Sequence, residues 1–203
     1  MRISTPEFIA LMAMLVATVA LSIDAMLPAL PNIAAEFSPN NTNQAQLVLS
    51  SFILGMAMGT FVMGPLSDSF GRKSVIYFGS GIFIVSSALC IFAPNLETIV
   101  VARIFQGIGA AAPRVVSQAL IRDLYSGREM ARISSFIMII FSLVPAVAPL
   151  LGASLISVLD WRAIFLAFVL FLFLICLYSL IFVSSSLAKA VSSKASAFQL
   201  LSI

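Results

Sequence analysis

The sequence contains no histidine, which removes several classes of active site from consideration. Zinc proteases with an HExxH motif and membrane-embedded serine proteases with a Ser-His dyad need the imidazole group as a metal ligand or as a proton acceptor. Cysteine is nearly as scarce, because Cys90 and Cys176 are the only two, and both lie in apolar runs where they are expected to pack as small hydrophobic side chains. We therefore predict that the protein is not an enzyme and that it holds no metal and no cofactor.

Charged residues are few as well. Asp, Glu, Lys and Arg make up 9% of the 203 residues, whereas 61% are hydrophobic and the mean hydropathy is +1.13. A chain with so little polar surface is expected to have lipid as its solvent. Alternating segments of about ten residues, which the strands of a β-barrel would show, do not occur in the sequence. We predict an all-α membrane protein.

Six apolar runs are long enough to cross a bilayer. Each has about 20 residues or more, and an α-helix of that length spans about 30 Å of hydrocarbon at about 1.5 Å per residue. The six spans fall into two sets of three with opposite orientation, which is the arrangement of an inverted repeat. The predicted bundle covers residues 1–184, with spans at 8–30, 47–66, 75–93, 99–121, 133–159 and 163–183, and a Ser/Ala-rich tail follows at 185–203.

Basic residues predict how the spans are oriented. If the N-terminus is cytoplasmic, eight of the eleven Lys and Arg residues lie in cytoplasmic segments and only Arg162 lies outside, while Arg103 and Arg114 lie within the fourth span. The positive-inside rule favours this orientation, with both termini in the cytoplasm. The formal net charge of +3 then reflects topology, so we predict a lipid-bilayer environment and no nucleic-acid partner.

The turn between the second and third spans reads GPLSDSFGRKSV, residues 64–75. The chain must reverse here within a few residues, so Gly71 can supply dihedral angles that other residues rarely adopt, and Asp68 can pair with Arg72. The segment closely resembles the signature that the major facilitator superfamily carries between its second and third helices. The matching residues, which the resemblance makes candidates for a conformational motif, are Gly64, Asp68, Gly71, Arg72 and Lys73. An ordinary positive-inside turn would explain the basic residues but not the whole pattern.

The fourth span contains RIFQGIGAAAPRVV, which is similar to the Arg-x-x-Gln-Gly segment of the same family and carries it at Arg103, Gln106 and Gly107. An arginine within a membrane helix is costly unless it faces protein or water, so Arg103 is a functional candidate. The alternative is that its side chain extends to the outer interface, because Arg103 is only six residues after Glu97. Arg114 lies deeper, and its role stays open.

Two further segments indicate a subfamily. In the fifth span, LVPAVAPLLGASL is similar to the antiporter signature of drug-exporting facilitators, with Pro145, Pro149 and Gly152 as candidate helix-packing residues, although alanine and valine replace some of its glycines. The first span ends in DAMLPALPNIAAEF, which resembles the Bcr/CflA (bicyclomycin/chloramphenicol resistance) group of drug:proton antiporters. The segments IRDLYSGREMAR and DWRAIF look like that group too.

This resemblance implies a proton-coupled multidrug efflux transporter of the bacterial inner membrane, with protons and small-molecule drugs as its partners. Transport of another small solute is the alternative within the family, and a truncated membrane protein without transport activity is the alternative outside it. The family has twelve helices in two halves, so six spans predict an N-terminal half that works with a missing C-terminal half or with a second copy of itself. A gene fragment, a frameshifted product and a natural half-transporter all stay open.

Asp24 is the candidate carrier of the coupling proton, and Arg103 and Gln106 complete the predicted proton-coupling or substrate site. Asp24 is about six residues from the outer end of the first predicted span and Arg103 about six residues from that of the fourth, so both are expected about 9 Å below the outer interface. Equal depth allows an ion pair, in which burial and the neighbouring charge together set the proton affinity of the carboxyl group. The alternative is a static pair that orients two helices.

Overall fold

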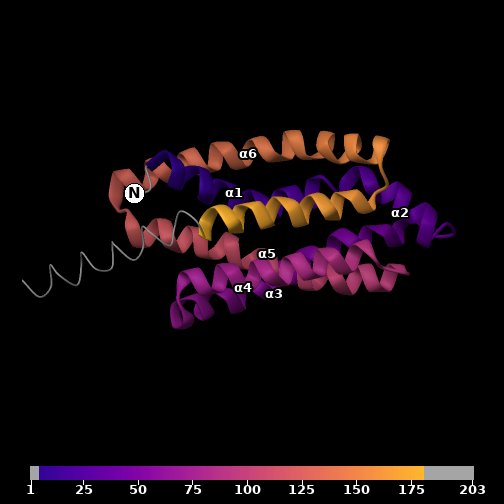
Figure 1. The fold of residues 1–203 in the computed structure, drawn as a ribbon, viewed down its shortest axis with the longest axis horizontal. Coiled ribbons are helices and arrows are strands. Elements are labelled where there is room, and N and C mark those ends of the chain that lie inside the picture. The colour runs from indigo at the N-terminus through magenta and orange to yellow at the C-terminus, as the bar shows by residue number, and fades with distance from the viewer. Residues whose placement is uncertain (1–4, 181–203) are drawn as a thin grey trace, which may run out of the picture.

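The structure is a computed structural model that describes residues 5–180, and the statements below refer to this part of the chain. It consists of helices without any strand, and six helical segments are long and apolar enough to cross a membrane (Figure 1). The predicted fold class and the six spans are therefore confirmed. The predicted tail at 185–203 and the end of the sixth predicted span lie outside the described residues.

The six passes are built from the labelled helices and one further helix. The labelled elements are α1 (Thr5–Asp24), η1 (Leu27–Ala29), α2 (Leu30–Phe37), η2 (Thr42–Gln46), α3 (Leu47–Phe70), α4 (Arg72–Ile91), α5 (Leu96–Leu124) and α6 (Gly127–Val158), where η marks a short 3-10 turn. The last helix, Arg162–Leu180, carries no label and is the yellow ribbon in Figure 1.

The first pass is longer than predicted and is broken in its second half. It covers residues 6–37, whereas the sequence predicted an end at residue 30. α1 ends at Asp24, and Pro28 and Pro31 lie in the first turns of η1 and α2. Proline has no N–H with which to continue the hydrogen bonds of a helix but is tolerated in a first turn, so the two prolines favour a helix that stops and restarts. Asp24 consequently lies at a break in the span.

α5 lies between α3 and α4, and glycines allow these three helices to touch. A Cβ atom added to Gly107 would meet the backbone of α3 at Phe52 and Met56, and one added to Gly109 would meet the backbone of α4 at Gly79. Small residues let membrane helices approach closely, which strengthens their van der Waals contacts. α3, α4 and α5 therefore form one tightly packed unit.

α1 packs against α6 and also contacts α5, so it joins α6 to the rest of the bundle. The last helix contributes aromatic side chains to the core. The ring centroid of Phe168 lies 6.4 Å from that of Phe83 on α4 and 5.9 Å from that of Phe165. Figure 1 shows α6 and α1 on one side of the bundle and α3 and α4 on the other, with α5 between them.

A polar cluster closes the end of the bundle at which α2 lies. Glu36 of α2 accepts a hydrogen bond from Trp161 Nε1 at 2.7 Å and forms a salt bridge with Arg162 Nη2 at 2.6 Å. Arg162 also pairs with Asp160 at 2.9 Å, and its guanidinium lies 4.3 Å from the ring centroid of Trp161. These contacts attach α2 to the turn between α6 and the last helix.

Candidate functional site

Arg103 lies on α5 and is completely enclosed by protein, with 0% of its surface exposed. Its Nε donates to the Val48 carbonyl at the start of α3 (3.0 Å), and its Nη2 donates to the Ser22 carbonyl in the last turn of α1 (3.1 Å). The guanidinium also lies over the Phe52 ring, 4.4 Å from its centroid. The side chain is therefore held inside the bundle, and it does not extend to the outer interface.

Gln106 connects Arg103 to α4. Arg103 Nη1 donates to Gln106 Oε1 (2.7 Å), Gln106 Nε2 donates to Ser87 Oγ (2.6 Å), and Ser87 Oγ donates to the Phe83 carbonyl (2.7 Å). All three polar side chains are buried. Each guanidinium nitrogen has an acceptor within the protein, as a charge in a medium of low dielectric constant requires. The network links α1, α3, α4 and α5.

The Ser22 carbonyl is available to Arg103 because α1 ends next to it. At this end the Ala25 N–H donates to the Leu21 carbonyl and the Met26 N–H donates to the Ile23 carbonyl, which leaves the Ser22 carbonyl between them for a side-chain donor. Helix ends leave several carbonyl groups without a backbone partner, and a cation there also interacts favourably with the helix dipole. The break in the first span thus creates the acceptor that Arg103 uses.

Asp24 ends α1 two residues beyond Ser22, and its side chain is half-buried. It forms no salt bridge with any described residue, so the ion pair with Arg103 that the sequence allowed is not present. The sequence prediction compared only the depths of Asp24 and Arg103 below the outer interface. Depth does not determine the direction in which a side chain points around its helix. The two residues are connected instead through the backbone, since Arg103 holds the carbonyl of Ser22 in the same helical turn.

Gly152 brings α6 to the same break in the first span. A Cβ atom added to Gly152 would meet the Ala25 carbonyl group and Pro28 Cγ, the latter at 3.0 Å. Pro145 and Pro149 lie inside α6 within two turns of this glycine. Gly152, one of the predicted helix-packing residues, therefore lies against Ala25, the residue that follows Asp24.

The turn between α3 and α4 lies at the other end of the bundle, about 30 Å along α3 from Val48 at about 1.5 Å per residue. Gly71 has a φ of +89°, a conformation that L side chains rarely adopt, which explains the glycine at this position. Gly64 lies about two turns further back in α3, where its Cβ position would be 3.9 Å from Val115 of α5. Lys73 is the second residue of α4, and its Nζ lies 5.8 Å from the ring centroid of Tyr77.

Arg72 makes the charged contacts of this turn. Its Nη1 pairs with Asp68 at 2.6 Å and also donates to Ser67 Oγ at 2.6 Å. Its Nε pairs with Asp123, near the end of α5, at 3.0 Å. The structure therefore brings together the predicted residues Asp68 and Arg72 and adds Asp123, which the sequence analysis did not single out although it lies in the quoted segment IRDLYSGREMAR.

Arg114, the second arginine within α5, is half-buried, and its Nη1 donates to the sulfur of Met56 at 3.3 Å. It forms no salt bridge within the described part of the chain. In the same part of the chain, no group of three or more His, Cys, Asp or Glu side chains is arranged to hold a metal ion.

Comparison with known proteins identifies relatives of most of the chain. A model of the Major Facilitator Superfamily matches residues 12–202. An uncharacterized MFS-type transporter of Bacillus subtilis (strain 168), YdgK, is 36% identical over 169 residues, which are 82% of this chain and 42% of that protein. A bicyclomycin resistance protein homolog of Haemophilus influenzae is 36% identical over 70% of this chain and 36% of its own length. A chloramphenicol resistance protein of Pseudomonas aeruginosa is 37% identical over 71% of this chain and 35% of its own length.

The chain thus spans less than half the length of these relatives. Its fold is similar to that of a solved transporter, the xylose transporter XylE from E. coli in an inward-open conformation. The TM-score is 0.66 at 18% identity, and the match covers 84% of this chain and 46% of that one.

Proposed function

Because the chain belongs to the Major Facilitator Superfamily, we propose that it forms one half of a transporter that exports small-molecule drugs across the bacterial inner membrane in exchange for protons. The similarity to bicyclomycin and chloramphenicol resistance proteins supports a drug as the substrate. The chain covers 42% of the length of YdgK, so in this proposal a second half completes the transporter and the substrate path lies between the two halves.

The observation that carries the proton-coupling part of the proposal is the position of Asp24. It is a half-buried carboxyl group without a salt bridge at a break in a membrane-spanning segment. Ionisable groups within such segments are costly, and they commonly mark proton or substrate pathways. In our proposal a proton and a cationic drug compete for the Asp24 carboxylate, and this competition couples export of the drug to entry of the proton.

In the proposal, Arg103 and Gln106 hold the end of α1 that carries Asp24 in place. Arg103 binds the last turn of α1, and Gln106 connects Arg103 to α4. A change in the charge of Asp24 alters the electrostatic field at the Ser22 carbonyl, two residues away, and therefore alters the strength of the hydrogen bond from Arg103. The conformation of the break between α1 and α2 would then respond to protonation.

The turn between α3 and α4 has a different role in the proposal. The salt bridges of Arg72 with Asp68 and Asp123 join three helix ends, but the side chains of these two aspartates are 66% and 50% exposed. Exposed ion pairs contribute about 0–1 kcal/mol each, so they can break and form again during a transport cycle. We propose that Gly64, Gly71 and Lys73 act with these pairs as the conformational motif.

The proposal is tested with the complete transporter in liposomes, by measuring efflux of a cationic drug driven by a pH gradient. Asp24→Asn should abolish gradient-driven efflux while binding of the drug persists, because the amide cannot carry a proton. Glu97→Gln is the matched control, since Glu97 is an exposed carboxyl group at the same end of the bundle, and it should export at the wild-type rate. Wild-type efflux by Asp24→Asn would exclude Asp24 as the coupling site. Gradient-driven movement of a sugar or metabolite instead of any drug would favour the other transport class.

A further inference from the structure

Ser87 is the member of the buried network that lies on α4, and its hydroxyl group meets Gln106 as an acceptor. Ser87 Oγ donates its single proton to the Phe83 carbonyl, one turn earlier in the same helix, at 2.7 Å. Gln106 Nε2 of α5 donates to the same oxygen at 2.6 Å. Ser87 is completely buried, so these two contacts fix the direction of its O–H bond. The serine therefore gives the core one hydrogen-bond acceptor that faces α5.

A close contact between α4 and α5 brings the short serine side chain within reach of Gln106. A Cβ atom added to Gly109 of α5 would lie 2.6 Å from the backbone nitrogen of Phe83 and 3.0 Å from its Cα atom. The two helices run in opposite directions, so the next turn of each brings Ser87 opposite Gln106. Because glycine lets the two backbones approach, the hydroxyl of Ser87 lies within hydrogen-bond distance of the amide.

The carboxamide of Gln106 needs two partners of opposite kind. Its oxygen accepts from Arg103 Nη1 at 2.7 Å, so its NH2 group points toward α4 and needs an acceptor there. Ser87 Oγ supplies this acceptor. Without the hydroxyl, an N–H group would be buried without a partner, which is costly. The amide can reduce this cost only by turning away from its present position, and that movement weakens its hydrogen bond with Arg103.

We propose that Ser87 is a positioning residue for the site at Asp24. Its hydroxyl holds the Gln106 amide on Arg103 Nη1. Arg103 in turn holds the carbonyl of Ser22, two residues before Asp24, through Nη2 at 3.1 Å. A single hydroxyl on α4 therefore determines how firmly the last turn of α1 is held. This inference rests on the proposed function for the role of Asp24, but the chain of hydrogen bonds can be tested without any transport.

The test is hydrogen–deuterium exchange of the purified chain in detergent, read by mass spectrometry of its peptides. It follows the end of α1, where the Ala25 N–H donates to the Leu21 carbonyl at 3.1 Å. Ser87→Ala should raise the exchange rate of residues 22–29 about tenfold, because a hydrogen bond of about 1.4 kcal/mol corresponds to a factor of ten. Ser86→Ala is the matched control, since Ser86 is also buried on α4 but takes no part in the network, and it should exchange as the wild type does.

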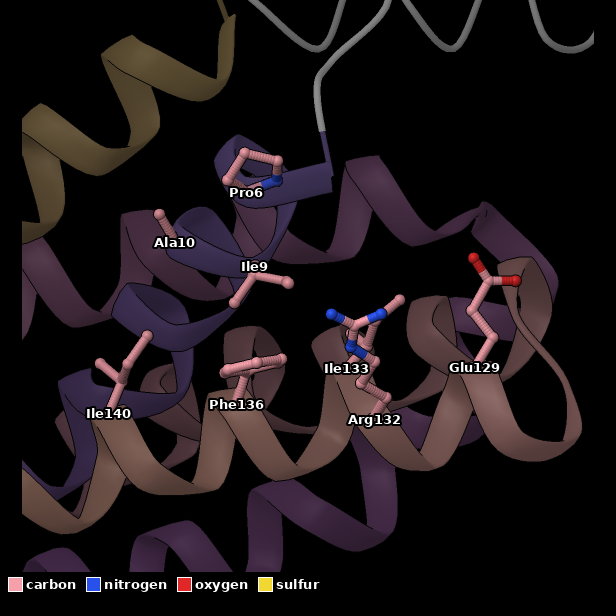
Figure 2. Close-up of a pocket in the computed structure, with 8 residues that line it drawn as sticks. All are labelled: Pro6, Ile9, Ala10, Glu129, Arg132, Ile133, Phe136 and Ile140. Carbon is pink, nitrogen blue, oxygen red and sulfur yellow. The ribbon is translucent and has the colours of Figure 1, made fainter.

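The start of α1 is the internal reference for this measurement. It lies roughly 20 Å along the helix from the end that Arg103 holds. Here Ile9 faces Phe136 of α6 across a groove of about 640 Å³ (Figure 2), and no residue of the buried network lines this groove. Exchange of residues 7–12 should therefore be the same in the wild type and in Ser87→Ala. A general loss of stability would instead raise the exchange rate at both ends of α1.

A second substitution separates positioning from packing. Gln106→Glu replaces the amide by a carboxylate, which has two oxygens and no N–H, so it can pair with Arg103 without an acceptor on α4. The double variant Ser87→Ala/Gln106→Glu should therefore exchange at residues 22–29 within about threefold of the wild-type rate. A packing defect at position 87 would not be repaired by this change.

Three results of the exchange experiment would each overturn the proposal: equal rates for Ser87→Ala and Ser86→Ala at residues 22–29, faster exchange at both ends of α1, or no rescue by Gln106→Glu. In the complete transporter, Ser87→Ala should lower gradient-driven efflux about tenfold, and efflux at the wild-type rate would likewise overturn it. Wild-type efflux by Asp24→Asn would refute the proposed function alone, because the exchange results do not depend on which residue carries the proton.

Discussion

Gly152 is the position at which α6 meets the break in the first span, and its replacement by alanine tests that contact. The added Cβ atom would lie 3.0 Å from the carbonyl carbon of Ala25 and 3.0 Å from Pro28 Cγ, and closer still to the Ala25 carbonyl oxygen. One neighbour is backbone and the other is a proline ring, so neither can rotate away and α6 must shift. Overpacking of this kind costs about 1–3 kcal/mol of unfolding free energy.

Gly81→Ala on α4 is the matched control, because nothing lies within 4 Å of the Cβ position of Gly81. Alanine at that position only removes the conformational-entropy cost of glycine in a helix, so the free energy of unfolding should rise by about 0.5–1 kcal/mol. Gly152→Ala receives the same benefit. The difference between the two variants therefore measures the clash alone, and we expect Gly152→Ala to be less stable than Gly81→Ala by about 1–3 kcal/mol.

The assay is reversible unfolding by SDS in mixed micelles, with two signals. Trp161 is the single tryptophan of the chain and is buried beside Glu36, so its fluorescence reports the end of the bundle at which α2 lies. Far-UV circular dichroism reports the helices as a whole. Equal stability of Gly152→Ala and Gly81→Ala by both signals would refute the reasoning. It would mean that α6 can move away from Ala25 and Pro28 without lowering the free energy of unfolding.

Two further predictions concern the buried network and the topology. Gln106→Leu removes the acceptor of Arg103 Nη1 and the donor to Ser87, so it should lower the free energy of unfolding by about 1–3 kcal/mol. Gln118→Leu, at an exposed position of the same helix, is the control and should change the free energy of unfolding by less than about 0.5 kcal/mol. Equal effects of the two substitutions in the SDS titration would contradict the network. Single cysteines in a background without Cys90 and Cys176 should react with an impermeant reagent from outside at Asn41 and Asn95 but not at Ser69 or Ser126, and external labelling of Ser69 would reverse the orientation.

The six spans could be predicted because a membrane-spanning segment must satisfy its backbone hydrogen bonds internally, and only a long apolar helix does so with a recognisable pattern. The end of the first span could not be located in this way. Its apolar run stops near residue 30, but the helix restarts as α2, which carries the polar residue Glu36 toward the last helix. That restart depends on a tertiary contact with Trp161 and Arg162, and hydropathy contains no information about it.

The candidate site could be predicted only where its residues lie on the same helix. The spacing of Arg103 and Gln106 places them on one face of a helix, and the structure has the corresponding hydrogen bond. The acceptors on other helices left no signal in the sequence, because every residue has a carbonyl group and only the position of a helix end makes the one at Ser22 available. Asp123 was overlooked because a charge in a polar loop is unremarkable until the fold places it 3.0 Å from Arg72.

The contacts of Arg103 have a consequence for how the chain enters the membrane. Arg103 belongs to the fourth pass, and its acceptors come from that pass or from earlier ones: the carbonyls of Ser22 and Val48 and the side chain of Gln106. In a chain synthesised from its N-terminus, the first three passes leave the ribosome before α5 does. The insertion penalty of an arginine, about 2.5–3.5 kcal/mol on translocon scales, can then be offset as soon as α5 arrives. The Phe165 ring, 5.9 Å from the guanidinium, belongs to the last helix and is synthesised later. The order of the helices along the chain therefore places the hydrogen-bond acceptors of Arg103 ahead of the arginine itself.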